Sequence, residues 1–335
     1  MADRRDADYM GRAIKAADAS RLIAPPNPWV GAAVVANTTV FTGATSQPGG
    51  PHAEINALAE AGDAAKGATM YSTLEPCCHV GRTGPCTDAI IDAEIARVVV
   101  ALVDPDSLVA GKGIAALRAA GIEVDVGVGA ARVERQLRPY LHHRRTGRPY
   151  VVLKLAATLD GFTAAPDRTS KWITGPEARA DGHRLRAESD AVLVGAGTIR
   201  ADDPSLTVRD FAPIGIDGSE IQPLRVVLGE APADAKAQPL LEVSGELGDV
   251  LDELGERQVL QLMVEGGAAV AGAFHQQGLV DRYVVYFAPA FFGGDDARPL
   301  FSGPGASTID DVWRGEIVDV RQLGGDVRVE LRPRR

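Results

Sequence analysis

Short apolar runs alternate with amphipathic stretches along the whole chain. In the first half, apolar residues at helical spacing predict helices over residues 6–20, 53–61, 87–96, 112–120 and 131–145. Compact apolar runs predict strands over residues 30–36, 68–73, 97–103 and 123–128. Because strands and helices alternate, this half is expected to form a largely parallel α/β sheet with helices on both faces.

The alternation resumes after Thr146-Gly147-Arg148-Pro149, a helix-breaking segment. Strands are predicted over residues 150–156, 191–195, 224–228, 261–264, 283–288 and 327–332, the last as an edge strand. Helices are predicted over 176–188, capped by Thr174, and over 267–277, with loops over 212–223 and 229–240. We therefore expect two domains, residues 1–145 and 146–335, each long enough to bury its own core.

Composition narrows the function classes. The net charge of -10 argues against a nucleic-acid-binding surface, which is normally basic. No apolar run approaches the roughly 20 residues that a membrane helix needs, and the N-terminal residues lack the apolar stretch of a signal peptide. Only three cysteines occur in 335 residues, which favours metal-bound thiolates over a disulfide framework. A cytoplasmic protein without membrane or nucleic-acid partners is expected.

The chemistry-bearing residues of the first half gather in one short window. It reads His52-Ala53-Glu54, then Pro76-Cys77, then Cys86. One imidazole and two thiolates fill three corners of a tetrahedral Zn2+ site and leave the fourth for water, as in a catalytic zinc site. Glu54 would carry the proton between water and substrate. His52 and Glu54 can share this site only if a helix begins at His52. The pattern resembles that of zinc deaminases.

A closed structural zinc knuckle is the alternative to a catalytic site. Such a knuckle needs a fourth protein ligand, and Cys78 or His79 could supply it. Each is more readily explained as a wall of a substrate pocket. Eight residues separate Cys77 from Cys86, whereas two usually separate the cysteines of zinc deaminases.

Longer segments carry a more specific resemblance. Residues 27–31 (Asn-Pro-Trp-Val-Gly), 52–54 and 73–86 resemble the deaminase domain of the bifunctional riboflavin biosynthesis deaminase-reductases. The resemblance implies a cytidine-deaminase-like α/β/α domain that deaminates a pyrimidine ribotide at its 2-amino position. It also implies that Asn27 holds the base and that Arg82 holds the 5′-phosphate, for which a guanidinium is well suited.

The second half shows no further metal pattern, and its glycine patterns are weak. Gly195-Ala196-Gly197 follows a predicted strand, but Arg200 replaces the last glycine of the dinucleotide fingerprint. Asp202-Asp203-Pro204 is expected to leave no room for the helix that this fingerprint requires. Glu265-Gly266-Gly267 is better placed, between a strand and a helix, where backbone N–H groups can receive a phosphate.

Four segments of the second half together resemble the reductase domain of the same family: residues 154–161, 170–174, 197–209 and 264–267. The resemblance implies a dihydrofolate-reductase-like α/β domain that uses NADPH to reduce a ribosyl side chain to ribityl. Carried over by position, the residues that contact NADPH are Ala157, Trp172, Thr198, Asp202 and Gly267. Those that contact the reductase substrate are Ser170, Arg186, Leu206, Arg209 and Glu265.

The residue types suggest roles within this second site. Arg186 and Arg209 can clamp a phosphate, and Trp172 offers a flat wall for the nicotinamide or ribose. The oxyanion formed by hydride transfer needs a proton donor, for which Lys154, Asp202 and Glu265 are candidates. An ion pair between Lys154 and Asp160 is the plain structural alternative. The segment from 228 to 260 is short for the family, as if a strand or an extended loop were missing.

The two sets of residues on one chain predict a bifunctional enzyme that deaminates and then reduces a small-molecule pyrimidine ribotide. One alternative is a deaminase whose C-terminal domain binds or dimerises without reducing. An RNA-editing deaminase is a more distant alternative, which the acidic charge disfavours. A zinc-stabilised binding module without activity is the non-enzymatic alternative. A homo-oligomer is expected.

Overall fold

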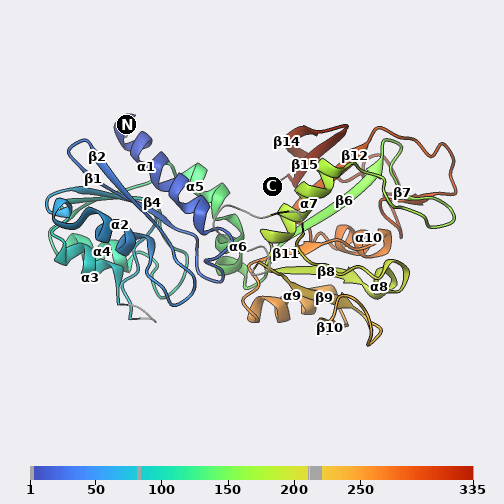
Figure 1. The fold of residues 1–335 in the computed structure, drawn as a ribbon, viewed down its shortest axis with the longest axis horizontal. Coiled ribbons are helices and arrows are strands. Elements are labelled where there is room, and N and C mark those ends of the chain that lie inside the picture. The colour runs from blue at the N-terminus through green and yellow to red at the C-terminus, as the bar shows by residue number, and fades with distance from the viewer. Residues whose placement is uncertain (1–3, 81–83, 210, 212–220, 335) are drawn as a thin grey trace. The chain divides into compact units, whose positions relative to one another are not determined.

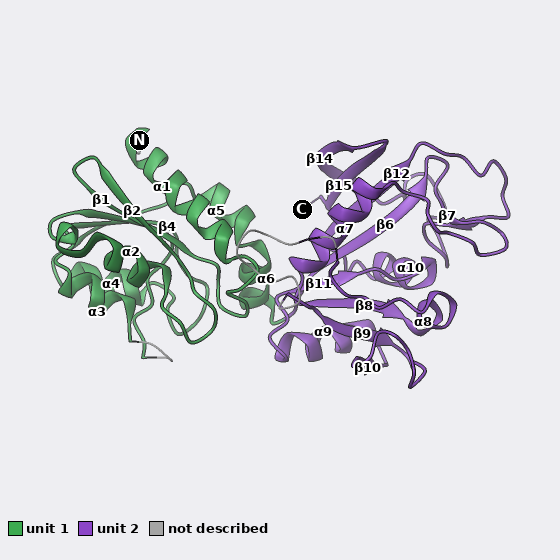
Figure 2. Ribbon diagram, in the orientation of Figure 1, with its two compact units in different colours: residues 1–147 green, residues 148–335 purple. Residues whose placement is uncertain are grey.

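The computed structural model describes residues 4–80, 84–209, 211 and 221–334. The chain folds as two compact units, residues 1–147 and 148–335 (Figures 1 and 2). Each unit has its own sheet and its own core. Each is therefore described by itself.

The first unit is built on a five-stranded sheet in the order β2-β1-β3-β4-β5. Its strands are β1 (Gly31–Ala36), β2 (Thr39–Ala44), β3 (Thr69–Leu74), β4 (Arg97–Leu102) and β5 (Glu123–Val126). Strands β3, β4 and β5 are parallel, but β1 pairs antiparallel with both β2 and β3. The sheet is thus mixed and not largely parallel as predicted. Strand β2 was not predicted, and it forms a hairpin with β1 through the turn at Asn37 and Thr38.

Helices cover both faces of this sheet. They are α1 (Arg4–Ala17), α2 (Ala53–Ala61), α3 (Cys86–Asp92), α4 (Lys112–Ala119), α5 (Ala130–Gln136) and α6 (Arg138–Thr146), with short 3-10 turns η1 (Asp18–Ser20) and η2 (Gly62–Ala65). Figure 1 shows α1 and α5 on one face and α2, α3 and α4 on the other. The helix predicted over 131–145 is in fact two helices. Pro139 lies in the first turn of α6, because it has no N–H to continue α5.

The second unit is built on an eight-stranded sheet in the order β10-β9-β8-β11-β6-β12-β15-β14. Its strands are β6 (Tyr150–Thr158), β8 (Ala191–Gly195), β9 (Leu224–Leu228), β10 (Leu241–Val243), β11 (Gln261–Val264), β12 (Arg282–Ala288), β14 (Gly315–Leu323) and β15 (Asp326–Pro333). Strands β7 (Phe162–Ala164) and β13 (Arg298–Pro299) form a separate pair. The six strands from β10 to β12 run parallel, and β15 and β14 complete the sheet antiparallel.

In the part of this unit that the structure describes, four helices pack on the two faces of the sheet: α7 (Pro176–Ala187), α8 (Ala196–Asp202), α9 (Leu247–Glu256) and α10 (Ala268–Gln276). Strand residues alternate between two cores, because successive side chains of a strand point to opposite faces. Val151 and Leu153 pack with α9 and α10, whereas Tyr150 and Val152 pack with α7. Helix α8 packs on the same face as α7, against Val192 and Val194.

Several predictions for the second unit were wrong. The helix judged impossible before Asp203-Pro204 exists as α8, which ends at Asp202 where Asp203 adopts a left-handed conformation. Strand β15 is not an edge strand, because the unpredicted β14 pairs with it. Thr174 does not cap α7; Gly175 is the N-cap, and its N–H donates to Asp326 Oδ2 at 2.7 Å. The segment between 228 and 260 holds β10 and α9, neither of which was predicted.

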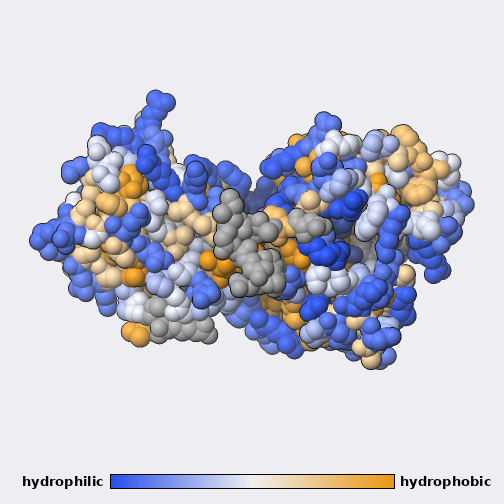
Figure 3. Space-filling model, in the orientation of Figure 1, coloured by the Kyte–Doolittle hydropathy of each residue, from blue (hydrophilic) through white to orange (hydrophobic). Residues whose placement is uncertain are grey.

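Figure 3 shows one face of the outer surface of the two units. Hydrophilic residues cover most of the surface of both units on the face drawn in Figure 3, with apolar residues in smaller patches. Within the described residues, the helices are all too short or too polar to cross a membrane.

Candidate active sites

The ends of three elements bring the zinc-type residues of the first unit together. His52 is the N-cap of α2 and Glu54 lies in its first turn, so the helix begins where the shared site requires. Cys77 follows strand β3, and Cys86 is the first residue of α3. The site therefore lies where β3 ends and two helices start, and the positive ends of helix dipoles favour thiolates there.

The ligand atoms have the separations that a zinc ion needs. The atoms of His52, Cys77 and Cys86 lie within 4.8 Å of one another. His52 Nδ1 is 3.5 Å from Cys77 Sγ and 3.3 Å from Cys86 Sγ. Zinc bonds of about 2.0–2.3 Å at tetrahedral angles place donor atoms roughly 3.6 Å apart. The hydrogen bond from the Cys86 thiol, with a further contribution from His52, lowers the pKa of Cys77 to about 4, and the same contact raises the pKa of Cys86.

Glu54 lies beside these ligands and is almost completely buried, with 3% of its surface exposed. Ser72 on β3 donates a hydrogen bond to Glu54 Oε1 at 3.0 Å and so fixes the carboxyl. Burial, reinforced by the charge of Cys77, raises the pKa of Glu54. A carboxyl whose pKa is raised holds a proton more readily, which suits a group that shuttles one between water and a leaving nitrogen.

The two candidates for a fourth protein ligand lie outside this cluster. Among the described residues, the group of potential ligand atoms contains His52, Cys77 and Cys86 but neither Cys78 nor His79. His79 lines the adjoining cavity, and its buried Nδ1 has no hydrogen-bond partner among the residues that the structure describes. This arrangement has the open corner of a catalytic site and not the four protein ligands of a closed knuckle.

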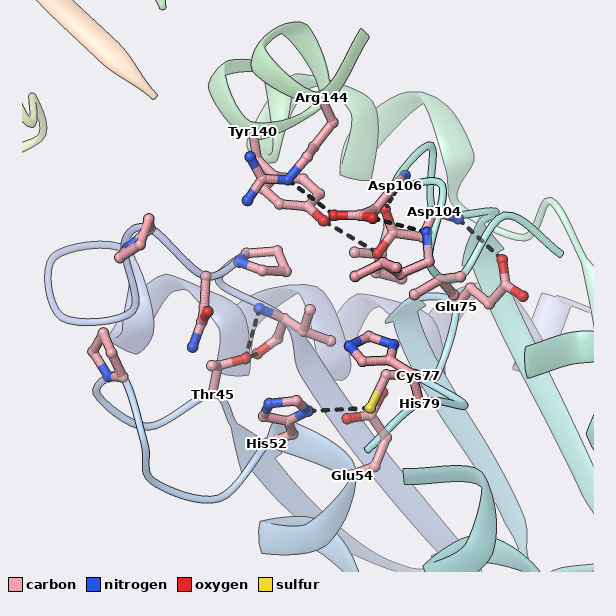
Figure 4. Close-up of a pocket in the computed structure, with 18 of the residues that line it drawn as sticks. Thr45, His52, Glu54, Glu75, Cys77, His79, Asp104, Asp106, Tyr140 and Arg144 are labelled. Atoms are coloured by element: carbon pink, nitrogen blue, oxygen red, sulfur yellow. Dashed lines mark hydrogen bonds and ion pairs between the residues drawn. The ribbon is translucent and has the colours of Figure 1, made fainter. Parts of the chain in front are cut away.

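A cavity of about 380 Å³ opens next to the ligand cluster (Figure 4). His52, Glu54 and Cys77 form one end of it, and Asn27, the predicted base-binding residue, also lines it. Its size is within the range of roughly 300–1,000 Å³ that is usual for small-molecule sites. Arg82, the predicted phosphate-binding residue, lies outside the described residues.

The far wall of the cavity was not predicted. It consists of Asp104 and Asp106, in the loop after β4, and of Tyr140 and Arg144 on α6 (Figure 4). Tyr140 Oη donates to both carboxylate oxygens of Asp104 at 3.1 and 3.2 Å. Arg144 Nε lies 3.2 Å from Asp106 Oδ2. Two sequence signals point to this wall: acidic residues directly after a buried strand, and polar residues four apart on a helix.

Asp104 is a buried ionisable group of this wall. Burial raises its pKa to about 6, although hydrogen bonds from the Asp106 N–H and from Tyr140 oppose the shift. The loop that carries it is fixed by Glu75, which accepts hydrogen bonds from the backbone N–H groups of Asp104, Gly111 and Ile114 at 3.2, 2.9 and 3.1 Å. The wall is therefore rigidly attached to the strand that delivers Cys77.

In the second unit, two of the polar residues predicted for the site, Arg186 and Glu265, form an ion pair. Arg186 on α7 donates from Nε and Nη2 to the two carboxylate oxygens of Glu265, both at 2.9 Å, and Nη1 donates to the Thr207 carbonyl at 2.6 Å. The predicted phosphate clamp is thus engaged with the protein's own carboxylate. Burial lowers the pKa of Lys154 on β6, and Glu265 only partly opposes that shift. Asp160 does not pair with Lys154; it accepts hydrogen bonds from Thr158 and from the Gly293 N–H.

The residues predicted to contact the cofactor lie on neighbouring elements. Thr198 and Asp202 are on α8, and Gly267 is the N-cap of α10. A side-chain carbon at Gly267 would lie 3.5 Å from Thr198 Oγ1, so these two residues are adjacent. Ala157 is completely buried in β6. The preceding Gly266 tolerates no side chain, since a Cβ there would lie 2.5 Å from Cβ of Val270.

The other predicted residues of the second site are more dispersed. Arg209 Nη1 reaches Thr207 Oγ1 at 3.3 Å, so Arg209 and Arg186 meet at Thr207. Leu206 is buried in the α8 core. Trp172 is 68% exposed, with the Arg179 guanidinium 4.7 Å from its ring centre. The hydrogen bonds and ion pairs of the described residues do not join Ser170 or Trp172 to the Arg186–Glu265 pair.

Comparisons with known proteins agree with this division. Residues 3–102 match the cytidine and deoxycytidylate deaminase zinc-binding region, and residues 149–329 match the RibD C-terminal domain. The riboflavin biosynthesis protein RibD of Escherichia coli is 39% identical over 98% of this chain and 99% of its own length. That of Aquifex aeolicus is 42% identical over 96% and 97%.

Two solved structures share the full-length fold. Acinetobacter baumannii RibD has a TM-score of 0.94 and 38% identity, covering 99% of each chain. A Thermotoga maritima diaminohydroxyphosphoribosylaminopyrimidine deaminase/5-amino-6-(5-phosphoribosylamino)uracil reductase has a TM-score of 0.86 and 33% identity, covering 98% of each. The predicted fold class is confirmed: a cytidine-deaminase-like unit precedes a dihydrofolate-reductase-like unit.

Fold and site together define a two-domain enzyme that joins a zinc-binding deaminase domain to a reductase domain. The chain belongs to the RibD family, the bifunctional deaminase-reductases of riboflavin biosynthesis. Matches to both domains over nearly the whole chain favour this bifunctional assignment over a deaminase with an inactive second domain.

Proposed function

We propose that the first unit deaminates 2,5-diamino-6-(ribosylamino)pyrimidin-4-one 5′-phosphate with Zn2+, and that the second unit then uses NADPH to reduce the ribosyl side chain to ribityl. The observation that carries the proposal is the cluster of His52, Cys77 and Cys86 at one end of a substrate-sized cavity, with buried Glu54 beside it. In this assignment, residues 1–145 form the deaminase domain and residues 146–335 form the reductase domain.

Zinc held by His52, Cys77 and Cys86 would supply a Lewis acid that lowers the pKa of a water molecule from 15.7 to about 7. Glu54 accepts the proton of that water while the oxygen bonds to the ring carbon that carries the 2-amino group. Glu54 then returns the proton to nitrogen, the C–N bond breaks and ammonia leaves. Asn27 orients the base in the cavity, and Arg82 binds the phosphate. Ser72 keeps the Glu54 carboxyl directed at the site.

NADPH would supply a hydride at the second site. The helix start at Gly267, with Thr198 adjacent, fits a cofactor phosphate, because backbone N–H groups are exposed at the first turn of a helix. Ala157, Trp172 and Asp202 complete the proposed cofactor contacts. Lys154 has a pKa lowered by burial and delivers the proton to the developing alkoxide.

The proposed substrate contacts at the second site are Ser170, Arg186, Leu206, Arg209 and Glu265. The Arg186–Glu265 pair orients both groups, and Arg209 adds a second guanidinium beside Thr207. Leu206 contributes through its backbone, since its side chain is buried in the core. The substrates are small molecules, and we propose a cytoplasmic homo-oligomer, which light scattering of the purified chain would test.

The decisive assay combines the purified protein with the diaminopyrimidinone ribotide, zinc and NADPH. Ammonia release followed by NADPH oxidation is expected. Absence of both would refute the proposal, and ammonia release without saturable NADPH binding would reduce the protein to a deaminase.

A further inference from the structure

Among the described residues, the lining of the deaminase cavity is mainly acidic, with a cationic side chain at one place. Four carboxyl groups line the cavity among the described residues: Glu54, Glu75, Asp104 and Asp106. Arg144 is the one lysine or arginine among these described lining residues. An anionic ribotide would be repelled by most of this surface, so the position of the guanidinium matters for binding.

Arg144 lies at the end of the cavity remote from the metal ligands. Arg144 and Tyr140 are four residues apart on α6 and so share one face of that helix. Figure 4 shows them across the cavity from His52 and Glu54. A pyrimidine whose amino-bearing carbon lies at Glu54 would extend its phosphorylated side chain away from the metal ligands, toward the other wall.

The Arg144 side chain is held in place on that wall. Its Nε is 3.2 Å from Asp106 Oδ2, its Nη1 is 2.7 Å from His143 Nδ1, and its guanidinium carbon is 4.9 Å from the centre of the Tyr140 ring. The side chain is 19% exposed, so it is both fixed and accessible from the cavity. A guanidinium fixed before binding loses little conformational entropy when it meets a phosphate, and its planar fork matches phosphate oxygens.

We propose that Arg144 is a specificity-determining residue of the deaminase site, which binds the 5′-phosphate of the substrate and so selects ribotides over ribosides. This inference rests on the proposed deaminase function. The assignment adds a guanidinium from α6, more than fifty positions after Cys86, to the Arg82 loop expected from the sequence.

The test compares the ribotide with the corresponding riboside in the full-length, zinc-loaded enzyme. KM is measured for the ribotide, and the inhibition constant is measured for the riboside as a competitor. Arg144→Met is expected to raise the ribotide KM about tenfold or more, as for loss of a charge-assisted hydrogen bond, and to leave the riboside constant unchanged. Arg144→Lys keeps the charge without the fork and should give an intermediate KM.

Two further variants separate phosphate binding from a purely structural role. Arg145→Met is the matched control, because Arg145 is the next residue of α6, is 52% exposed and pairs with Glu134; it should change neither constant. Asp106→Asn breaks the same ion pair but keeps the cation, so it should raise the ribotide KM much less than Arg144→Met does.

Equal increases in KM for Arg144→Met and Asp106→Asn, or equal losses for ribotide and riboside, would overturn the inference and leave Arg144 as a support of the loop. A wild-type enzyme that releases no ammonia from the ribotide would instead refute the proposed deaminase function. The two failures are therefore distinguishable.

Discussion

The two units hold their functional groups in different ways. In the first unit, three ligand atoms from distant positions meet within 4.8 Å beside a buried carboxyl. In the second, Arg186 and Glu265 pair with each other, and the remaining candidates are distributed over β6, α8, the start of α10 and the connecting loops. One site is a compact cluster, and the other is an extended surface.

The difference follows from the chemistry of the groups that each site would hold. A zinc ion accepts few ligand types at short and fixed distances, so His52, Cys77 and Cys86 must converge. A dinucleotide is long and binds through backbone N–H groups, flat apolar walls and single polar contacts. Its site can therefore be spread over many elements, as the positions of Thr198 and Gly267 on two different helices illustrate.

We expect the largest effect on activity at the zinc-type site of the first unit, where it tests whether the two sites work independently. Glu54→Gln removes the proton carrier and should lower kcat for deamination by about 10²–10⁴-fold. Zinc content and NADPH oxidation with the deaminated substrate should be unchanged, because the second unit has its own site. Glu60→Gln, an exposed residue of the same helix, is the control. Parallel loss of both activities in Glu54→Gln would show that the two units do not work independently.

The second prediction tests the buried ion pair of the extended site. Burial alone would raise the pKa of Glu265, but Arg186 and Lys154 hold it below its usual value. The Glu265 side chain is 13% exposed, and Arg186→Leu removes its hydrogen-bonded partner and leaves only the Lys154 charge nearby. This loss should destabilise the second unit by about 3–5 kcal/mol and abolish reduction. Deamination should persist. Denaturant unfolding and the two separate assays measure these effects.

The matched control for that variant is Arg257→Leu. Arg257 pairs with Glu253 four residues away on the surface, where the two side chains are 50% and 45% exposed. Its loss should cost under about 1 kcal/mol, because water and salt screen exposed pairs. Similar costs for the two variants would mean that the Arg186–Glu265 pair is an ordinary surface contact.

The same chemical difference determines how much the sequence could predict. His52, Glu54, Cys77 and Cys86 were identified because metal chemistry restricts both residue type and spacing, and the structure brings them together. Most strands and helices of both units were also predicted, since each has a clear apolar period. Strand β14 was missed because it is largely exposed and carries no such period.

The far wall of the deaminase cavity has local signals in the sequence, but these do not show that its residues meet. Tyr140 and Asp104 are 36 positions apart, and only the packing of α6 against the loop after β4 makes them partners. The split between α5 and α6 was also missed, although Pro139 was a local signal for it. Long-range contacts of this kind depend on tertiary packing, which a pattern of residue types does not specify.

A third prediction contrasts two carboxyl groups through pH. Folding raises the pKa of Asp104 from 3.8 to about 6, so ionisation destabilises the fold as pH rises through this interval. Asp104→Asn removes that penalty, and its stability relative to wild type should increase between pH 4 and 6 by up to about 3 kcal/mol. Urea unfolding at several pH values measures this difference.

The exposed Asp252 of the second unit should behave in the opposite sense. The Arg148 guanidinium lowers the pKa of Asp252, so its ionised form is the one that stabilises the fold. Asp252→Asn should therefore lose stability relative to wild type as pH rises, by a small amount because the pair is solvated. A common direction for both variants would contradict the assigned pKa shifts.

The smallest effect is expected for Cys78→Ala, and it tests whether the first site is open. Cys78 lies next to a metal ligand in sequence but outside the ligand cluster, and burial raises its pKa, so it remains a thiol. The variant should keep one zinc per chain and its deaminase activity, whereas Cys86→Ala should lose the metal. Loss of zinc from Cys78→Ala would identify a fourth protein ligand. The zinc site of the first unit would then be a closed structural site. It would stabilise the fold and would not catalyse a reaction, unlike the proposed site of the second unit.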